Sequence, residues 1–181
     1  MIEKVVKFGI ARTVVLAALL IVTACADSAR VQTDARYQSV GLDFSANAYV
    51  AVPRDGSYGS TNYPGSGAQV AQVIRSALLF HLTRVTEGGS WEDLDQALAS
   101  AAAGGYRYLF FPTILHWEDR ATEWNMKPDR VTVKIDVMEV ASKKRLTSAT
   151  INGKSGVVTM GGDHPQDLLP EPVANFIRQL F

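Results

Sequence analysis

The strictest pattern in this sequence is a strand-like alternation between Arg130 and Val140. Four branched apolar residues alternate there with polar ones, and the apolar set is Val131, Val133, Ile135 and Val137. Successive side chains of a strand point to opposite faces, so the pattern predicts a strand with one face in a core and one in water. A turn at residues 141–144 and a second extended run at 145–152 predict its hairpin partner.

Two more strands and one short extended piece are predicted upstream of this hairpin. Ala48–Pro53 is a short apolar run closed by proline, which is typical of a buried strand. Tyr106–His116 is apolar on both faces, which suits a central strand. Pro112 has no N–H to donate to a ladder, so we expect a bulge or an unpaired edge there. Arg84–Glu87 is the short extended piece.

Two helices are predicted between these strands. Apolar residues recur at three- and four-residue steps over residues 67–83, which predicts an amphipathic helix. Ser90 and Asp93 are spaced like the N-cap and N3 residues of a capping box, which predicts the start of a second helix. That helix places Trp91 on its buried side and ends at the glycine pair 104–105, since glycine permits the left-handed conformation of a helix end.

A third helix is predicted at the C-terminus. Asp163 and Gln166 are spaced as N-cap and N3. Pro170 and Pro172 do not both fit an undisturbed helix interior, so we expect a turn near residues 165–169 and a main helix from Pro170 onward. The whole order predicts a single α+β domain, with one mixed sheet of about four to five strands packed with about three helices.

The N-terminal segment has the composition of an export signal. Lys4, Lys7 and Arg12 precede a run without charge from Thr13 to Ala24. The run is shorter than the about 20 apolar residues of a membrane-spanning helix, and it has the size of the apolar region of a signal peptide. It ends in Val22-Thr23-Ala24-Cys25, which resembles the lipobox of bacterial lipoproteins.

The resemblance implies that residues 1–24 are removed and that Cys25 is acylated, with diacylglyceryl and a further fatty acid such as palmitate. Cys25 is the one cysteine of the chain, so it has no disulfide partner within it. We expect residues 25–45 to form a lipidated tether and residues 46–181 to form a periplasmic α/β domain. Ala26, in place of the aspartate that retains lipoproteins in the inner membrane, favours the outer membrane, facing the periplasm.

Two other interpretations of the N-terminus are a plain secretory peptide cleaved near Ala24 and an N-terminal anchor helix. The lone cysteine at the lipobox position and the polar sequence that follows it weigh against both. The chain has no net charge, and its leader is basic. The mature part is therefore slightly acidic, and binding to nucleic acid is not expected.

The most distinctive segment of the mature chain follows the central strand. Its six candidate binding residues are Trp117, Glu118, Asp119, Arg120, Glu123 and Trp124. Adjacent carboxylates on a strand point to opposite faces, so Glu118 and Asp119 are poorly arranged for catalysis. One interpretation has Arg120 held by Glu118 or Glu123, with the tryptophans forming a partner surface, because Trp and Arg dominate interface energetics. The other is a self-stabilised hairpin loop whose rings cover the sheet edge.

The remaining candidates carry little chemistry. The glycine-rich stretch 56–67 lies between a strand and a helix, where amides can hold a phosphate, but it lacks a full nucleotide-binding motif and is better interpreted as a surface loop. The histidines, at positions 81, 116 and 164, do not predict a metal site, and Asp163 with His164 is at most half of one. Ser66 and Ser155 lack a nucleophile-elbow pattern. No cofactor is expected.

The sequence FPTILHWEDRATEW at residues 111–124 resembles the signature of an uncharacterised lipoprotein family, domain of unknown function 4823. NGKSG at 152–156, GGDHP at 161–165 and the glycine loop near 52–67 are similar to the same family. The resemblance implies a periplasmic lipoprotein and transfers no activity. At the level of fold, the order of elements resembles the N-terminal domain of TolB and the envelope lipoproteins LpoB and CsgG.

These observations favour a non-enzymatic accessory protein of the cell envelope. We expect a lipid bilayer and an unidentified envelope protein as its partners. A module that binds a small molecule or a glycan is the first alternative, and a hydrolase is the second. An aromatic loop on a tethered domain, without a recognisable catalytic arrangement, motivates this order.

Overall fold

The structure is a computed structural model that describes residues 27–34, 40–119, 128–156 and 164–181. Its strands are β1 (Ser28–Thr33), β2 (Asn47–Val52), β3 (Ser57–Tyr58), β4 (Thr61–Asn62), β5 (Arg84–Trp91), β6 (Tyr108–Glu118), β7 (Arg130–Glu139) and β8 (Lys144–Lys154). Its helices are α2 (Ser66–Leu78), α3 (Leu94–Ala103) and α4 (Pro170–Arg178), and a 3-10 turn at Pro165–Leu168 precedes α4.

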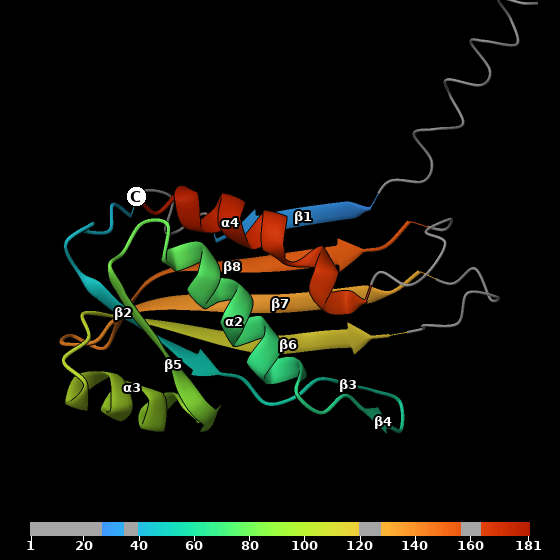
Figure 1. Cartoon of the computed structure of the whole chain (residues 1–181), viewed down its shortest axis with the longest axis horizontal. Helices are drawn as coiled ribbons and strands as arrows, with labels where there is room; N and C mark the ends of the chain where they lie inside the picture. The colour runs from blue at the N-terminus through green and yellow to red at the C-terminus, as the bar shows by residue number, and fades with distance from the viewer. Residues whose placement is uncertain (1–26, 35–39, 120–127, 157–163) are drawn as a thin grey trace, which may run out of the picture.

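Six of the strands form one sheet in the order β1-β8-β7-β6-β2-β5, and β3 and β4 form a separate hairpin (Figure 1). β2 runs parallel to both of its neighbours, β5 and β6. The pairs β1–β8, β8–β7 and β7–β6 are antiparallel. The predicted α+β class, mixed sheet and three helices are thus confirmed for the described residues, whereas the predicted four to five strands was too low.

β1 corrects the expected tether. The sequence predicts that residues 28–33 lie in a tether that reaches residue 45, but they pair with β8, from Ser28 opposite Lys154 to Thr33 opposite Ala149. Most of its side chains are exposed and only Val31 packs against the core. An edge strand with so few apolar residues has no period that sequence reasoning can find, because its stability comes from the ladder with β8. Residues 1–26 lie outside the described part, so the leader and the lipidation remain predictions.

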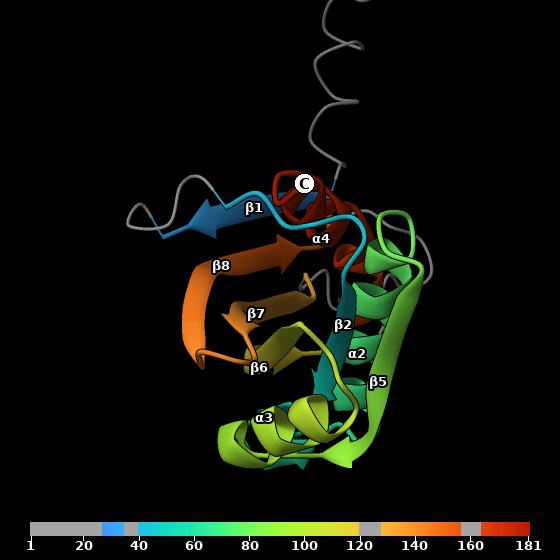
Figure 2. The same ribbon diagram turned by 90° about the vertical axis from the view of Figure 1, so that its left-hand side faces the viewer.

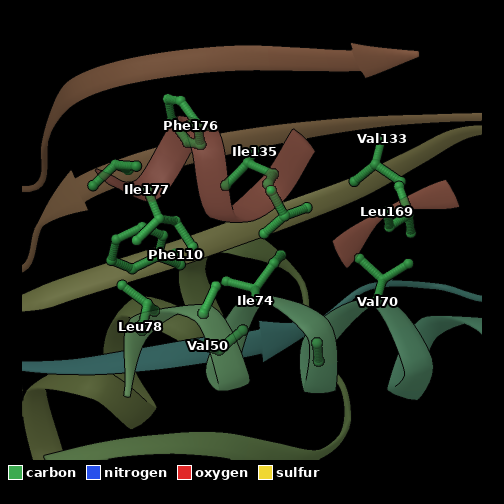
Figure 3. Close-up of a cluster of buried hydrophobic side chains, with 14 of the residues drawn as sticks. Val50, Val70, Ile74, Leu78, Phe110, Val133, Ile135, Leu169, Phe176 and Ile177 are labelled. Atoms are coloured by element: carbon green, nitrogen blue, oxygen red, sulfur yellow. The ribbon is translucent and has the colours of Figure 1, made fainter. Parts of the chain in front are cut away.

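Helices cover both sides of the sheet. On one side of the sheet α2 packs against β2, β5 and β6, and α4 packs against α2, β1 and β8; α3 packs on the other side, against β2 and β6 (Figures 1 and 2). Figure 3 shows the larger core, in which the labelled side chains are Val50, Val70, Ile74, Leu78, Phe110, Val133, Ile135, Leu169, Phe176 and Ile177. Each fully buried side chain of this size contributes about 1.5–3 kcal/mol through the hydrophobic effect. In the described part of the chain no helix has the length and apolarity to span a membrane.

The prediction for the second helix was wrong at its start. The short extended piece is in fact the eight-residue strand β5, and its last residue, Trp91, is 46% exposed rather than buried on a helix. The helix begins after Asp93, whose carboxylate accepts the Gln96 N–H in a capping box. Parallel pairing with β2, in which Val52 lies opposite Trp91, overrides the local helix signal.

Gly88 permits this pairing because the Tyr49 hydroxyl passes close to it. A Cβ atom at position 88 would lie 2.7 Å from the Tyr49 oxygen. That hydroxyl donates a hydrogen bond of 2.8 Å to the Glu92 carboxylate. Burial, together with the hydrogen bond to Glu92, raises the pKa of Tyr49 to about 12.

The other local predictions concern Pro112 and the start of the last helix. β2 pairs with β6 only from Tyr108 to Phe110, so Pro112 lies beyond that ladder, as expected of an unpaired edge. The bulge of β6 falls later, between Ile114 and His116. The turn before the last helix and the start of that helix at Pro170 are confirmed, whereas the predicted cap Asp163 lies outside the described residues.

Candidate functional site

The two connections that follow β2 run in opposite directions across the sheet. β2 leads through α2 to β5 on one side of it, and β5 leads back through α3 to β6 on its other side. The two crossovers lie on opposite faces of the sheet, as the separate clusters around α2 and α3 show. The carboxyl ends of β2 and β6 therefore form a topological switch point, the place where open α/β sheets commonly bind ligands.

A groove of about 480 Å³ lies at this point, and we call it the switch-point groove. Its walls are residues 53–57 after β2, Trp91 at the end of β5, Asp93 and Leu94 at the start of α3, and residues 111–116 of β6. This position follows from the topology, because β2 and β6 separate after Phe110 and leave room between them.

The rim of the groove exposes large apolar side chains to solvent. Trp91 is 46% exposed, Leu94 39% and Leu115 56%. The guanidinium of Arg54 lies 4.4 Å from the centre of the Trp91 ring, a cation–π contact. These four residues were not among the predicted site residues. The sequence predicted that Trp91 lies on the buried face of a helix, so its exposure was not expected.

The glycine-rich loop forms one wall of the groove and is held together by its own side chains. The Asp55 carboxylate accepts the N–H groups of Gly65 at 3.1 Å and Gly67 at 2.8 Å. The Ser66 hydroxyl accepts the Gly56 N–H and donates to the Tyr63 carbonyl, both at 2.8 Å. The amides that a phosphate would need at the start of α2 already bind Asp55, which favours the interpretation as a self-supporting surface loop.

Trp117 does not present its ring to a partner. It is 2% exposed and packs against Gly56, where an added Cβ would lie 2.4 Å from the Trp117 Cβ. The bulge at Leu115 explains the difference from the expectation, because one extra residue reverses which face every later side chain of β6 occupies. Trp117 therefore joins Phe110 and Ile114 on the face toward α2 and α4.

The Glu118 and Asp119 carboxylates each lie close to a different histidine. The Glu118 carboxylate is buried and lies 3.3 Å from His116 Nε2. The Asp119 carboxylate lies 3.2 Å from His164 Nδ1, and the Asp119 carbonyl accepts a 3.3 Å hydrogen bond from the Tyr63 hydroxyl. The two carboxylates therefore do not form a catalytic pair.

The rest of the predicted binding segment, with Arg120, Glu123 and Trp124, lies outside the described residues. The ion pair that the sequence predicts for Arg120 and the contact role of Trp124 therefore remain predictions.

Ser66, Ser155 and the three histidines have partners within the fold. The Ser155 hydroxyl accepts the Asp129 N–H at 2.8 Å, and Ser66 holds the glycine loop, so both hydroxyls serve the backbone. The His81 ring is stacked on Phe181 at 4.7 Å. Within the described ranges, no three His, Cys, Asp or Glu side chains gather as metal ligands. The exposed side chains on the rim of the switch-point groove are suited to contact with a partner or a ligand.

Comparison with known proteins supports the fold. PelC from Paraburkholderia phytofirmans, crystallised as a dodecamer, is 15% identical with a TM-score of 0.64, and the match covers 84% of this chain and 97% of that chain. The lipoprotein GNA1162 from Neisseria meningitidis is 14% identical with a TM-score of 0.50, over 74% of this chain and 98% of that chain. At this identity the likeness concerns the fold alone.

The C-terminal domain of LpoB from Escherichia coli also matches, at 12% identity and a TM-score of 0.36, over 65% of this chain and 89% of that chain. That score is too low to support an argument, and the likeness to TolB and CsgG stays a prediction. A comparison with curated proteins found no significant match.

The model of the family described as domain of unknown function (DUF4823) matches residues 42–180. This range contains the whole sheet except β1, all three described helices and every wall of the switch-point groove. The chain is therefore a member of the DUF4823 family, as its tryptophan-containing motif after residue 110 predicted.

Proposed function

We propose that the mature chain is a lipid-anchored protein of the bacterial envelope that binds another protein at the switch-point groove and catalyses no reaction. The observation that carries this proposal is the exposure of Trp91, Leu94 and Leu115 around one groove, with Arg54 stacked on the tryptophan. Trp and Arg are enriched among the residues that dominate binding energy, and such residues cluster in pockets at the centre of an interface.

The proposed surface continues into the segment after β6. β6 forms one wall of the groove, and Arg120, Glu123 and Trp124 follow it directly in sequence. We keep these three residues in the proposed contact surface, whereas the buried Trp117 supports it from the core. Outer-membrane attachment through Cys25, facing the periplasm, is part of the same proposal and rests on the lipobox and on Ala26.

Contact with a protein partner is tested by site-specific photo-crosslinking in cells. A photo-reactive amino acid at Leu115, which is 56% exposed at the groove, is expected to give a discrete adduct. The matched control is Leu79, which is 43% exposed at the end of α2 and should not give that adduct. Mass spectrometry of the adduct distinguishes a different protein from a second copy of this chain, a relevant outcome because PelC is described as a dodecamer.

Two results would contradict the contact. Absence of any adduct at Leu115 would argue against a protein at the groove. Identical adducts at Leu115 and Leu79 would show that the crosslinks report random collision. The Trp91→Ala variant adds a check, since removal of the ring is expected to weaken the Leu115 adduct without changing the amount of protein in the cell.

Lipid attachment has its own test. Metabolic labelling with an alkyne fatty acid is expected to mark the wild-type protein and to be lost completely in Cys25→Ser, because the thiol is the atom that accepts the diacylglyceryl group. Ala26→Ser serves as the matched control and should keep the label. A Cys25→Ser protein that still carries fatty acid would refute the anchor and leave the groove proposal to be judged separately.

The second candidate function is a module that binds a small molecule in the same groove. Its volume of about 480 Å³ lies in the range of about 300–1,000 Å³ that ligand pockets occupy. A ligand on the Trp91 ring would change the intrinsic fluorescence of the wild type but not of Trp91→Phe. An unchanged spectrum across wall fragments and nucleotides would leave protein binding as the better account.

A further inference from the structure

One face of the antiparallel half of the sheet carries no described helix. α2 and α4 lie on the opposite side of β7 and β8, and α3 packs against β2 and β6 (Figure 2). The side chains that alternate with the buried valines of β7 point to this face, and they are Arg130, Thr132, Lys134 and Asp136. We call it the open sheet face. It is polar from Arg130 to Asp136, whereas the opposite face of the same stretch is apolar.

Strand register brings three cations together at one end of the open sheet face. Arg130 of β7 lies directly opposite Lys154 of β8, and Lys154 lies opposite Ser28 of β1. Arg30, two residues along β1, lies opposite Asn152 and diagonal to Lys154. Like charges directly opposite each other on neighbouring strands destabilise a sheet. The Arg130–Lys154 pair therefore destabilises this end of the sheet.

Two other cations of the same face, Lys134 and Arg145, pair with a carboxylate. Lys134 lies 2.8 Å and Arg145 3.0 Å from the Asp136 carboxylate. Burial alone would raise the pKa of Asp136, but the hydrogen bonds from these cations outweigh it and lower the pKa. In the described part of the chain, Arg30, Arg130 and Lys154 have no carboxylate within ion-pair distance.

Two carboxylates at this end of the sheet are already engaged. Glu118, which lies opposite Arg130, is buried and faces His116 at 3.3 Å. Asp27 accepts the Gly156 N–H at 2.8 Å. Both carboxylates keep their charge, but neither of them lines the groove that the three cations share.

The cations line a groove of about 760 Å³, which we call the basic groove. Neutral hydrogen-bonding side chains line it as well, namely Ser28, Gln32, Thr132 and Asn152, together with His116. The Thr132 hydroxyl donates to Asn152 Oδ1 at 3.0 Å, which orients the amide and leaves its NH₂ group as a donor. Cations and oriented amide donors side by side match a ligand that carries both acidic groups and hydroxyls.

We propose that the basic groove binds an anionic oligosaccharide. The three cations would bind its carboxylate or phosphate groups through charge-assisted hydrogen bonds. Gln32, Thr132 and Asn152 would bind its hydroxyls. A concave site of this size fits a short chain of sugar rings, whereas a bilayer presents a flat surface. The two grooves share only His116 among the residues that line them, and the three cations line the basic groove alone, so this proposal does not rest on the proposed protein contact.

Calorimetric titration of the full-length protein in a neutral detergent tests the proposal. Oligogalacturonate, which carries one carboxylate per sugar, is expected to bind, and neutral malto-oligosaccharide of equal length is not. The double variant Arg130→Gln/Lys154→Gln should weaken binding of oligogalacturonate by about tenfold or more, because each lost charge-assisted hydrogen bond is worth at least that factor. Arg130→Lys should keep most of the affinity.

The matched control removes two positive charges elsewhere. Arg75→Gln/Arg178→Gln changes α2 and α4, on the other side of the sheet, and should leave affinity unchanged. The thermal midpoint separates binding from a structural role. Because Lys154 lies opposite Arg130 and Ser28, Lys154→Gln is expected to keep or raise the midpoint at low salt. A lowered midpoint would show that Lys154 stabilises the fold, which would overturn the argument.

Three further results would overturn the proposal. They are no binding of oligogalacturonate, equal binding of the neutral sugar, and equal weakening by both double variants. Soluble dihexanoyl phosphatidylglycerol provides the last comparison. If it binds as tightly as oligogalacturonate and depends on the same cations, the groove takes a lipid headgroup and the assignment to an oligosaccharide fails.

Discussion

Replacement of Trp117 by alanine is expected to lower the free energy of unfolding by about 3–5 kcal/mol, the usual cost of truncating a large buried aromatic residue. The ring is 2% exposed and is one of the largest fully buried side chains of the described part. It packs against Gly56, whose missing side chain leaves room for it. Chemical denaturation followed by circular dichroism measures the effect.

Trp91→Ala is the matched control, because it removes the same side chain from a position that is 46% exposed. We expect it to cost no more than about 1 kcal/mol, as is usual for surface substitutions. The reverse order, with Trp91→Ala the costlier change, would mean that the faces of β6 after the bulge are assigned wrongly. In that case Trp117 would return to the contact surface that the sequence first predicted.

Gly67→Ala is expected to destabilise the protein by about 1–3 kcal/mol, as overpacking does. Inside a helix this change ordinarily stabilises by about 1 kcal/mol. Here the new Cβ would lie 2.2 Å from the Pro53 carbonyl oxygen, a backbone atom that cannot rotate away. The same substitution would also move the Gly67 N–H away from Asp55, which accepts it at 2.8 Å.

Gly89→Ala is the matched control for that substitution. It lies in β5, and an added Cβ would have no atom within 4 Å. We expect a neutral or slightly stabilising change, because glycine costs about 0.5–1 kcal/mol relative to alanine inside a strand. Thermal unfolding of both variants measures the difference. Equal midpoints would show that α2 does not approach the end of β2 as closely as described.

The candidate site in the structure differs from the segment that the sequence predicted. The two tryptophans of the segment 117–124 predicted a contact surface there. Of its residues, Trp117 and Glu118 are buried, and Asp119 binds His164. Trp91, which the helix pattern had placed in the core, is an exposed aromatic residue at this end of the sheet. The segment remains relevant because it follows the strand that forms a wall of the groove.

Several elements were predictable because their signal is local. The alternation over residues 130–140 predicted β7, and its four apolar residues are all buried. The apolar steps after Gly67 predicted α2, and the paired prolines predicted a break before α4. In each case the hydrophobic period depends only on neighbours in the sequence, so it can be recognised without knowledge of the tertiary contacts.

The remaining features depended on residues far away in the chain. β1 is a strand because β8 offers it a ladder, and Trp91 ends a strand because β2 pairs with it. The three cations of the basic groove come from β1, β7 and β8, and only strand register makes them neighbours. No local period encodes such pairings, because the free energy of strand pairing comes from contacts between segments that are far apart in the sequence.

The sequence by itself therefore determined the class of the fold, most of its helices and strands, its membership of the DUF4823 family and the expectation of a lipid anchor at Cys25. The tertiary structure alone decided which side chains reach solvent after the bulge in β6, and therefore where a partner or ligand can bind. The physical reason is that one extra residue at Leu115 reverses the faces of the strand, and only its pairing with β7 reveals that residue.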